Sequence, residues 1–131
     1  KKHYFLFAGG SGITPMMSII KTVLKMEQQS SITLFYGNND EAGIIFKNQL
    51  EKITNEFSGK INICHILNSP PPSYPAMFTG LMTKEKIAEL ISGINSQDSN
   101  NEYFICGPTP MMDNVKSVLD EKKINENKIN K

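Results

Sequence analysis

The feature that most limits how this chain can fold is an alternation of short apolar runs with segments of helical period. The apolar runs are rich in β-branched and aromatic residues, which is typical of strands covered on both faces. They cover residues 4–8, 32–37, 61–67 and 102–107. Strand and helix alternate four times, which predicts an α/β fold: a doubly wound parallel sheet with helices on both faces.

The helical segments repeat apolar residues every three or four positions. Their apolar faces are formed by Ile19, Ile20, Val23 and Leu24, by Ile44, Ile45, Leu50 and Ile53, by Ile87, Leu90 and Ile91, and by Met111, Met112, Val115, Val118 and Leu119. We expect the methionines Met16, Met17, Met26, Met111 and Met112 to fill the core. Residues 68–80 are too proline-dense for a helix or a central strand, and residues 92–101 are interpreted as a polar solvent loop.

The 131 residues suit one domain, and no internal repeat or second core is visible. Residues 124–131 are interpreted as the start of a truncated fifth strand. The chain lacks an initiator Met and the apolar region of a signal peptide. We therefore expect residues 1–131 to be a fragment of a longer protein.

Composition excludes several classes of partner. The formal net charge of +1 gives no electrostatic basis for binding nucleic acid or an anionic membrane. No apolar run approaches the ~20 residues that a membrane span needs. Two cysteines in a chain of this length do not form a disulfide framework. The expected location is a reducing compartment, the cytoplasm.

A glycine-rich turn, residues 9–12, separates the first predicted strand from the first predicted helix. Glycines allow positive φ and close approach of a ligand to the main chain, and a helix N-terminus attracts phosphate. Thr14 is the predicted N-cap and Pro15 the predicted first helical residue. The dinucleotide fingerprint G-x-G-x-x-G is matched by Gly10 and Gly12, with Pro15 in place of the third glycine. The alternative is a tight turn without a ligand.

Two further strands end in unusual turns. The second is followed by residues 36–41 (YGNNDE) and the fourth by residues 106–110 (CGPTP). In a doubly wound sheet, ligands bind beyond the carboxyl ends of the strands. Three special turns at one edge favour a ligand site more strongly than any one of them.

The segments AGGSGITPMMSII, FYGNNDEAGIIFKNQLEKI and YFICGPTPMMDNVKSVL, in this order, resemble the nicotinamide-nucleotide domain of the ferredoxin–NADP⁺ reductase superfamily. YGN followed by IIFKNQLEKI, with INICHIL beyond it, is most similar to reductase components of oxygenases such as the phenylacetyl-CoA oxygenase reductases of phenylacetate degradation. The resemblance implies an NAD(P)H-binding module of a flavin-dependent oxidoreductase. It would position nicotinamide for hydride transfer to FAD, and electrons would then pass to an oxygenase.

The resemblance also implies which residues bind the cofactor. They are Gly9, Gly10, Ser11, Gly12, Ile13, Thr14, Pro15, Tyr36, Gly37, Asn38, Asn39, Cys106, Gly107, Pro108 and Met111. The turn at residues 9–15 would hold the pyrophosphate and ribose, and residues 36–39 would meet the adenosine end. Cys106 and Thr14 would lie near the nicotinamide as catalytic residues. Related sequences often carry Arg where Asn39 stands, so the adenosine contact departs from the family pattern.

Two cofactors of the family are expected only in the full-length protein. FAD would be bound by a preceding barrel domain of the same chain, and a [2Fe–2S] cluster by a further domain. Two cysteines on different strands cannot supply four thiolate ligands, so the fragment alone is predicted to be inactive. NADH is favoured over NADPH because Asp40 and Glu41 follow the second strand, while Lys47, the nearest lysine, lies further along.

A non-catalytic nucleotide-binding or signalling module is the alternative. A receiver-like domain would carry an acidic cluster at the strand ends, where this chain has Gly, Asn and Cys. No group of residues has metal-ligand spacing. Without the resemblance, Cys106 is interpreted as an ordinary buried thiol. Cys64 is interpreted as a core residue, and His65 as a core histidine with its hydrogen bonds satisfied.

Overall fold

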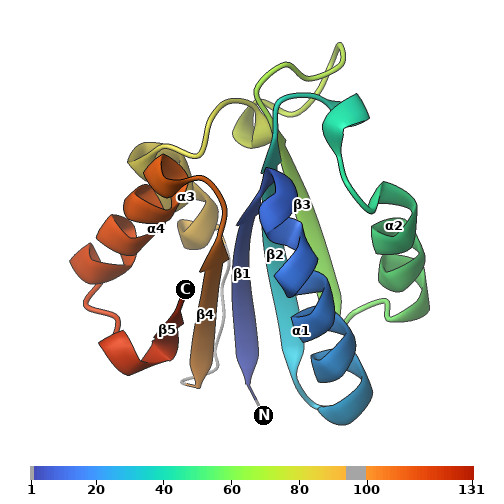
Figure 1. The fold of residues 1–131 in the computed structure, drawn as a ribbon, viewed down its shortest axis with the longest axis vertical. Coiled ribbons are helices and arrows are strands. Elements are labelled where there is room, and N and C mark those ends of the chain that lie inside the picture. Colours follow the sequence, from blue (N-terminus) through green and yellow to red (C-terminus); the bar gives the residue numbers. More distant parts are fainter. Residues whose placement is uncertain (1, 94–99) are drawn as a thin grey trace.

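The fold is built on one five-stranded parallel sheet with the strand order β3-β2-β1-β4-β5 (Figure 1). The computed structural model describes residues 2–93 and 100–131. The strands are β1 (His3–Gly9), β2 (Ser31–Asn38), β3 (Ile61–Leu67), β4 (Asn101–Cys106) and β5 (Ile129–Asn130). Every residue of β1 is buried, as expected for a central strand covered on both faces. The predicted strands and the short fifth strand are confirmed.

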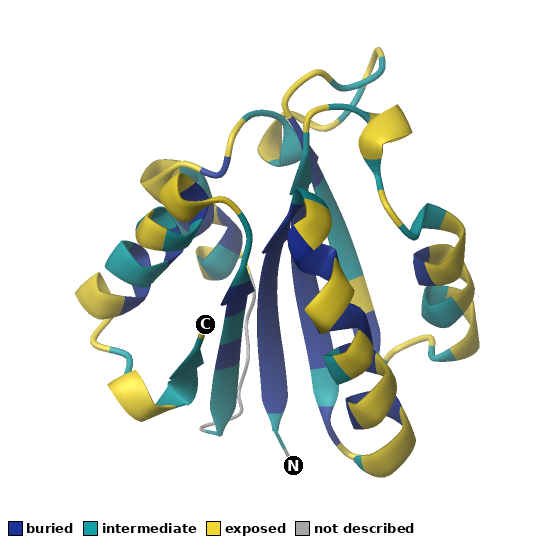
Figure 2. Ribbon diagram, in the orientation of Figure 1, coloured by how far each residue is buried: buried dark blue, intermediate teal, exposed yellow. Residues whose placement is uncertain are grey.

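Two helices cover each face of this sheet. Helices α1 (Ile13–Met26) and α2 (Lys47–Glu56) lie on one face, and α3 (Lys84–Ser92) and α4 (Thr109–Glu121) lie on the other. Each face has its own apolar cluster: Leu6, Ile20 and Leu34 belong to the first, and Phe7, Phe35 and Val115 to the second. In Figure 2 the buried residues follow the strands and the inner sides of the helices. The predicted doubly wound architecture is confirmed.

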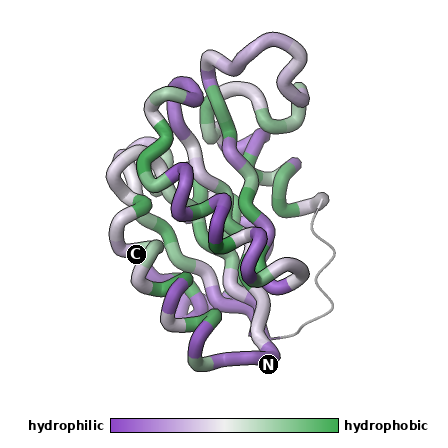
Figure 3. Tube along the Cα trace, turned by 90° about the vertical axis from the view of Figure 1, so that its right-hand side faces the viewer, coloured by the Kyte–Doolittle hydropathy of each residue, from purple (hydrophilic) through white to green (hydrophobic). Residues whose placement is uncertain are grey.

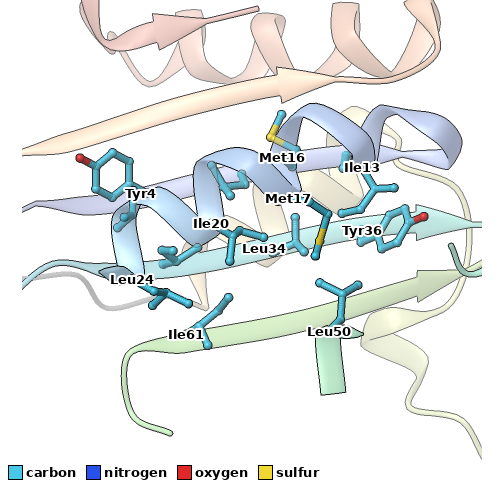
Figure 4. Packing of buried hydrophobic residues seen from close by; sticks show 14 residues of the cluster. Tyr4, Ile13, Met16, Met17, Ile20, Leu24, Leu34, Tyr36, Leu50 and Ile61 are labelled. Carbon is cyan, nitrogen blue, oxygen red and sulfur yellow. The ribbon is translucent and has the colours of Figure 1, made fainter. Parts of the chain in front are cut away.

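The hydropathy pattern explains why these helices lie where they do. In Figure 3 the strands carry long hydrophobic stretches, while the helices change between hydrophobic and hydrophilic within each turn. An amphipathic helix buries its apolar stripe against the sheet and leaves its polar face in water. Figure 4 shows this for α1, where Ile13, Met17 and Ile20 point toward the strands.

Three details differ from the sequence-based expectations. Met26, at the last position of α1, is 71% exposed because it lies outside the buried stripe of this helix. Helix α2 begins at Lys47, so Ile44 and Ile45 lie in the connection before it; Phe46 caps the helix with a left-handed φ of 62°. The polar loop predicted for residues 92–101 lies mostly outside the described residues; Ser92 instead ends α3.

In the described part of the chain, no helix combines the length and apolar character needed to cross a bilayer.

Candidate functional site

The carboxyl ends of β1, β2 and β4 lie side by side at one edge of the sheet. Strand β1 is central in this group: its Gly9 is opposite Gly37 of β2, and its Ala8 is opposite Cys106 of β4. The order of the sheet reverses between β1 and β4, since connections on the two sides of this point use opposite faces. Ligands of doubly wound proteins bind at such a switch point. The predicted convergence of strand ends is thus confirmed.

The glycine-rich turn takes a more specific shape than its sequence indicates. Residues Gly10–Gly12 form a 3₁₀ turn, η1, that runs directly into α1. Gly12 is therefore the N-cap, Ile13 is the first helical residue, and no side chain caps the helix. The predictions of Thr14 as N-cap and Pro15 as first helical residue are wrong, because the 3₁₀ turn starts the helix earlier. Pro15 is tolerated as the third helical residue, where no intrahelical N–H partner is lost.

Gly10 provides the open part of this turn. It has a φ of +54°, which favours glycine, and a Cβ added there would meet nothing within 4 Å. The first turn of α1 carries no acidic side chain that would offset the partial positive charge of the helix N-terminus. Bare backbone beside a helix N-terminus is the environment in which proteins bind phosphate.

The other glycines of the site hold elements close together. A Cβ at Gly12 would lie 2.2 Å from the carbonyl oxygen of Cys106, so only glycine lets α1 start against the end of β4. A Cβ at Gly9 would lie 2.8 Å from the Met111 sulfur, and one at Gly107 would lie 3.0 Å from the Gly9 nitrogen. These residues therefore shape the site by packing.

Two cavities open at this edge, one on each side of the glycine turn. The β2-side cavity has a volume of about 290 Å³ and includes Gly10, Asn38 and Asn39 in its lining. The β4-side cavity has a volume of about 370 Å³ and is formed by residues 9–12 together with Cys106, Gly107 and Pro108. Gly9, Gly10 and Pro108 belong to both, so the two cavities meet over the turn.

A residue that lines the β2-side cavity carries a buried polar atom without a hydrogen-bond partner among the described residues. The side-chain nitrogen Nδ2 of Asn38 is buried and donates no hydrogen bond within the described protein. A buried amide left unpaired is costly, and such groups in proteins are usually satisfied by water or a ligand. Asn38 and the open cradle at Gly10 line the same cavity, so a turn of the Asn38 side chain would let this donor meet an acceptor oxygen of a ligand such as a dinucleotide.

The predicted cofactor residues do not all present their side chains to the cavities. Ile13 and Tyr36 are completely buried, while Met111 and the backbone of Gly37 contribute to the β2-side cavity. Ser11, Asn39 and Pro108 are exposed and line the cavities. Thr14 and Pro15 are exposed on α1 and line neither cavity. Cys106 is half-buried: it packs against the α1-side core and lines the β4-side cavity.

The end of β3 also contributes to the β2-side cavity, which the sequence reasoning missed. Asn68 follows β3, and Gly80, Leu81 and Met82 return to the same cavity after the proline-rich loop. The Gly80 N–H donates to the Leu67 carbonyl at 2.9 Å, which fixes this return. The carboxyl-end rule applied to the third strand would have identified Asn68.

Charges beside the site are largely engaged. The Asp40 carboxylate accepts from the Gly43 N–H at 2.9 Å, and the Lys47 ammonium donates to Glu41 at 2.8 Å. The hydrogen bond with Lys47, and then its positive charge, lower the pKa of Glu41. In this conformation Lys47 is paired with a carboxylate.

His65 differs from its prediction as a satisfied core histidine. It is half-buried in a separate groove between α2 and β3, and its Nδ1 atom has no hydrogen-bond partner within the described residues. Burial, followed by the charge of Lys47, lowers its pKa. Burial raises the pKa of the half-buried Cys64 thiol. Within residues 2–93 and 100–131, no three His, Cys, Asp or Glu side chains are grouped to hold a metal ion.

Comparisons with known proteins agree with this geometry. Residues 6–117 match the family model described as "Oxidoreductase NAD-binding domain". The chain is 34% identical over 122 residues to NADH-cytochrome b5 reductase 1 of Laccaria bicolor, covering 92% of this chain and 39% of that protein. It is 32% identical over 116 residues to a subunit of the 1,2-phenylacetyl-CoA epoxidase of Escherichia coli, covering 88% of this chain and 32% of that protein.

A solved structure of an NAD⁺-bound protein also has the same fold as this chain. The CS-b5R domains of human Ncb5or, in the NAD⁺ form, superpose with a TM-score of 0.85 at 26% identity, over 98% of this chain and 36% of that one. The chain spans about two fifths or less of the length of these relatives, 39% and 32% for the two curated proteins. The chain belongs to the oxidoreductase NAD-binding domain family, within the ferredoxin–NADP⁺ reductase superfamily.

Proposed function

We propose that this chain is the NADH-binding module of a flavin-dependent reductase. The observation that carries the proposal is the pair of cavities that meet over the Gly10 turn, with Asn38 in the lining of one and Cys106 in the lining of the other. A dinucleotide has two nucleoside ends joined by a pyrophosphate, and this arrangement offers one cavity to each end.

Different parts of the chain bind different parts of the dinucleotide. The backbone of the Gly10 turn and the α1 N-terminus bind the pyrophosphate, since both favour negative charge. The β2-side cavity takes the adenosine end, where Asn38 donates to an acceptor oxygen and Leu81 and Met82 supply apolar contact. The β4-side cavity takes the nicotinamide end, where Cys106 is part of the lining. A role of Thr14 near the nicotinamide stays a prediction.

When bound, NADH supplies a hydride from C4 of its nicotinamide to the N5 atom of a flavin. The contribution of this chain is orientation. Cys106 and the Gly107 backbone form one wall of the β4-side cavity and would hold the ring at a fixed position. Orientation matters because small misplacements of reacting atoms can reduce rates by about 10²-fold.

The flavin and the electron acceptor are assigned to other parts of the protein or to partners. The flavohem-like FAD/NAD binding domain of nitric oxide dioxygenase from Vibrio cholerae is a longer chain with a similar fold. The match covers 96% of this chain and 48% of that one. That likeness, at 18% identity, concerns the fold. We propose that residues 1–131 form the nucleotide-binding part and that a flavin domain of the same chain completes the reductase.

The acceptor is proposed to be a one-electron carrier. Relatives of this chain are named for cytochrome b5 and for a phenylacetyl-CoA epoxidase. The epoxidase relative supports the prediction of an oxygenase partner in phenylacetate degradation. The [2Fe–2S] centre and the cytoplasmic location stay predictions.

A preference for NADH follows from the charges beside the adenosine end. A 2′-phosphate needs a free Arg or Lys, whereas Lys47 donates to Glu41 and the chain has Asn38 and Asn39 at the end of β2. Asp40 adds a carboxylate that would repel a phosphate.

Binding of NADH to the purified chain tests the proposal. We expect saturable binding of NADH and of ADP in calorimetry, with weaker binding of NADPH, and a colourless protein that reduces no dye. Absence of dinucleotide binding at millimolar ligand would refute the proposal. ATP or GTP binding tighter than NADH would favour a nucleotide-binding or signalling module instead. Flavin copurifying at one equivalent per chain would refute the assignment of flavin to another domain.

A further inference from the structure

Tyr36 is a buried tyrosine whose hydroxyl reaches the glycine turn. Its side chain is 0% exposed, and its ring lies against the His65 ring at 5.9 Å between centroids. Figure 4 shows its oxygen pointing toward the carboxyl end of the strands, near Ile13 at the start of α1. The hydroxyl donates to the Gly10 carbonyl at 3.1 Å and accepts from the Ile45 N–H at 3.2 Å.

The Gly10 carbonyl is therefore held from two sides. It also accepts a hydrogen bond from the Ile13 N–H within the 3₁₀ turn. The peptide between Gly10 and Ser11 is trans, as are all described peptides of the chain. In a planar trans peptide, the carbonyl and the following N–H point in opposite directions. Because the Gly10 carbonyl points inward to Tyr36, the Ser11 N–H points outward.

The outward direction leads to the proposed pyrophosphate position. Gly10 and Ser11 both line the β4-side cavity, and the space around Gly10 is open. A backbone N–H in this position can donate to a phosphate oxygen without any rearrangement of the turn. Hydrogen bonds to charged acceptors are stronger than neutral ones.

We infer that Tyr36 is a positioning residue that aims the Ser11 N–H at the pyrophosphate, an inference that rests on the proposed dinucleotide function. Tyr36 acts through the Gly10 peptide and does not itself touch the ligand. This role differs from the adenosine contact that the family resemblance implies. Its buried ring and twice-bonded hydroxyl support the indirect role.

The decisive variant is Tyr36→Phe, which removes the hydroxyl and keeps the ring. The Gly10 carbonyl then keeps only the Ile13 N–H, so one of the two hydrogen bonds that fix the orientation of its peptide is lost. We expect the dissociation constants of ADP and NADH to rise about ten-fold, equivalent to about 1.4 kcal/mol. Adenosine, which has no phosphate, should bind to the variant and the wild type with the same dissociation constant.

Tyr4→Phe is the matched control. Tyr4 is also a buried tyrosine, and its hydroxyl donates to the Glu27 carboxylate, 2.8 Å from each oxygen. It lies near the start of β1, at the opposite end of the sheet from the glycine turn. Deleting this hydroxyl should lower stability without changing the binding of any of the three ligands.

The outcomes separate this inference from the proposed function. If the wild type binds neither ADP nor NADH, the proposed function fails. If the wild type binds both and Tyr36→Phe binds them equally well, the function stands and the role of Tyr36 is wrong. An equal loss for adenosine and ADP would show direct adenosine contact, which also overturns the inference.

A measurement on the wild type keeps the test decisive if Tyr36→Phe does not fold. In amide NMR spectra, ADP should move the Ser11 N–H proton downfield, as expected for a new hydrogen bond to phosphate. A Ser11 signal that stays in place while other signals of the turn shift would overturn the inference.

Discussion

Replacing Gly12 by Ala tests the close packing at the centre of the site. Gly12 has φ −61° and ψ −10°, a conformation that any L-residue adopts, so backbone strain does not explain the glycine. The lack of space explains the glycine, because an added Cβ would lie 2.2 Å from the Cys106 carbonyl oxygen and 2.6 Å from the Cys106 carbonyl carbon. Ordinary contacts need at least 3.4 Å, so α1 and the end of β4 would have to separate by more than about 1 Å.

The expected loss of stability follows from two opposing effects. Forcing extra atoms into a packed region costs about 1–3 kcal/mol. The lower flexibility of the unfolded chain returns about 0.4–1 kcal/mol. The net loss of about 1–2 kcal/mol should lower the melting temperature by roughly 4–10 °C for a chain of this size.

Gly10→Ala is the matched comparison, because a Cβ there meets no atom within 4 Å. Its left-handed φ costs about 1–2 kcal/mol, partly offset by the same entropic gain, so the melting temperature should fall less than in Gly12→Ala. Its methyl group enters the space proposed for the pyrophosphate and should weaken NADH binding. Circular dichroism melts and NADH titrations measure both effects. A Gly12→Ala melting temperature within 1 °C of the wild type would refute the packing argument.

The remaining predictions concern Cys106, Glu41 and His65. In the reductase that contains this chain and its flavin domain, Cys106→Ala should slow flavin bleaching by NADH about 10²-fold in stopped flow and leave the NADH dissociation constant within a few-fold. An unchanged rate would make the cysteine a packing residue only. Glu41→Gln releases the Lys47 ammonium and should improve NADPH binding several-fold relative to NADH; an unchanged ratio would show that Lys47 cannot reach the coenzyme. Burial holds the pKa of His65 below its usual value. The unfolded imidazole therefore binds a proton first as the pH falls below about 6.5, and stability falls through this range. His65→Gln should reduce that loss in urea titrations at pH 7 and 5.5, and an equal loss would contradict this reasoning.

The fold was predictable because its signals are repeated along the chain. Four apolar runs and four helical segments each indicate the same doubly wound sheet, so an error at one boundary changes little. The start of α2 shows this: Ile44 and Ile45 fall outside the helix, yet the layer that α2 occupies is as expected.

The site was predictable only in part, because its details depend on contacts between distant segments. Gly12 looked like a phosphate residue, and the structure adds that the Cys106 carbonyl leaves no room for a side chain. Thr14 has the chemistry of an N-cap, but the 3₁₀ turn before α1 starts the helix first. Nothing local in YGNND shows that the Tyr36 hydroxyl turns inward to Gly10.

Amide NMR mapping of NAD⁺ on the chain is the most direct test of whether the carboxyl edge of the sheet binds a dinucleotide. We expect saturable shifts at the carboxyl edge of the sheet, at Gly10, Asn38, Asn68 and Gly107. We expect little change at His65, which lies in the separate groove beside α2. Shifts that centre on that groove, or no saturable shifts at millimolar NAD⁺, would contradict the assignment of this edge as a dinucleotide site.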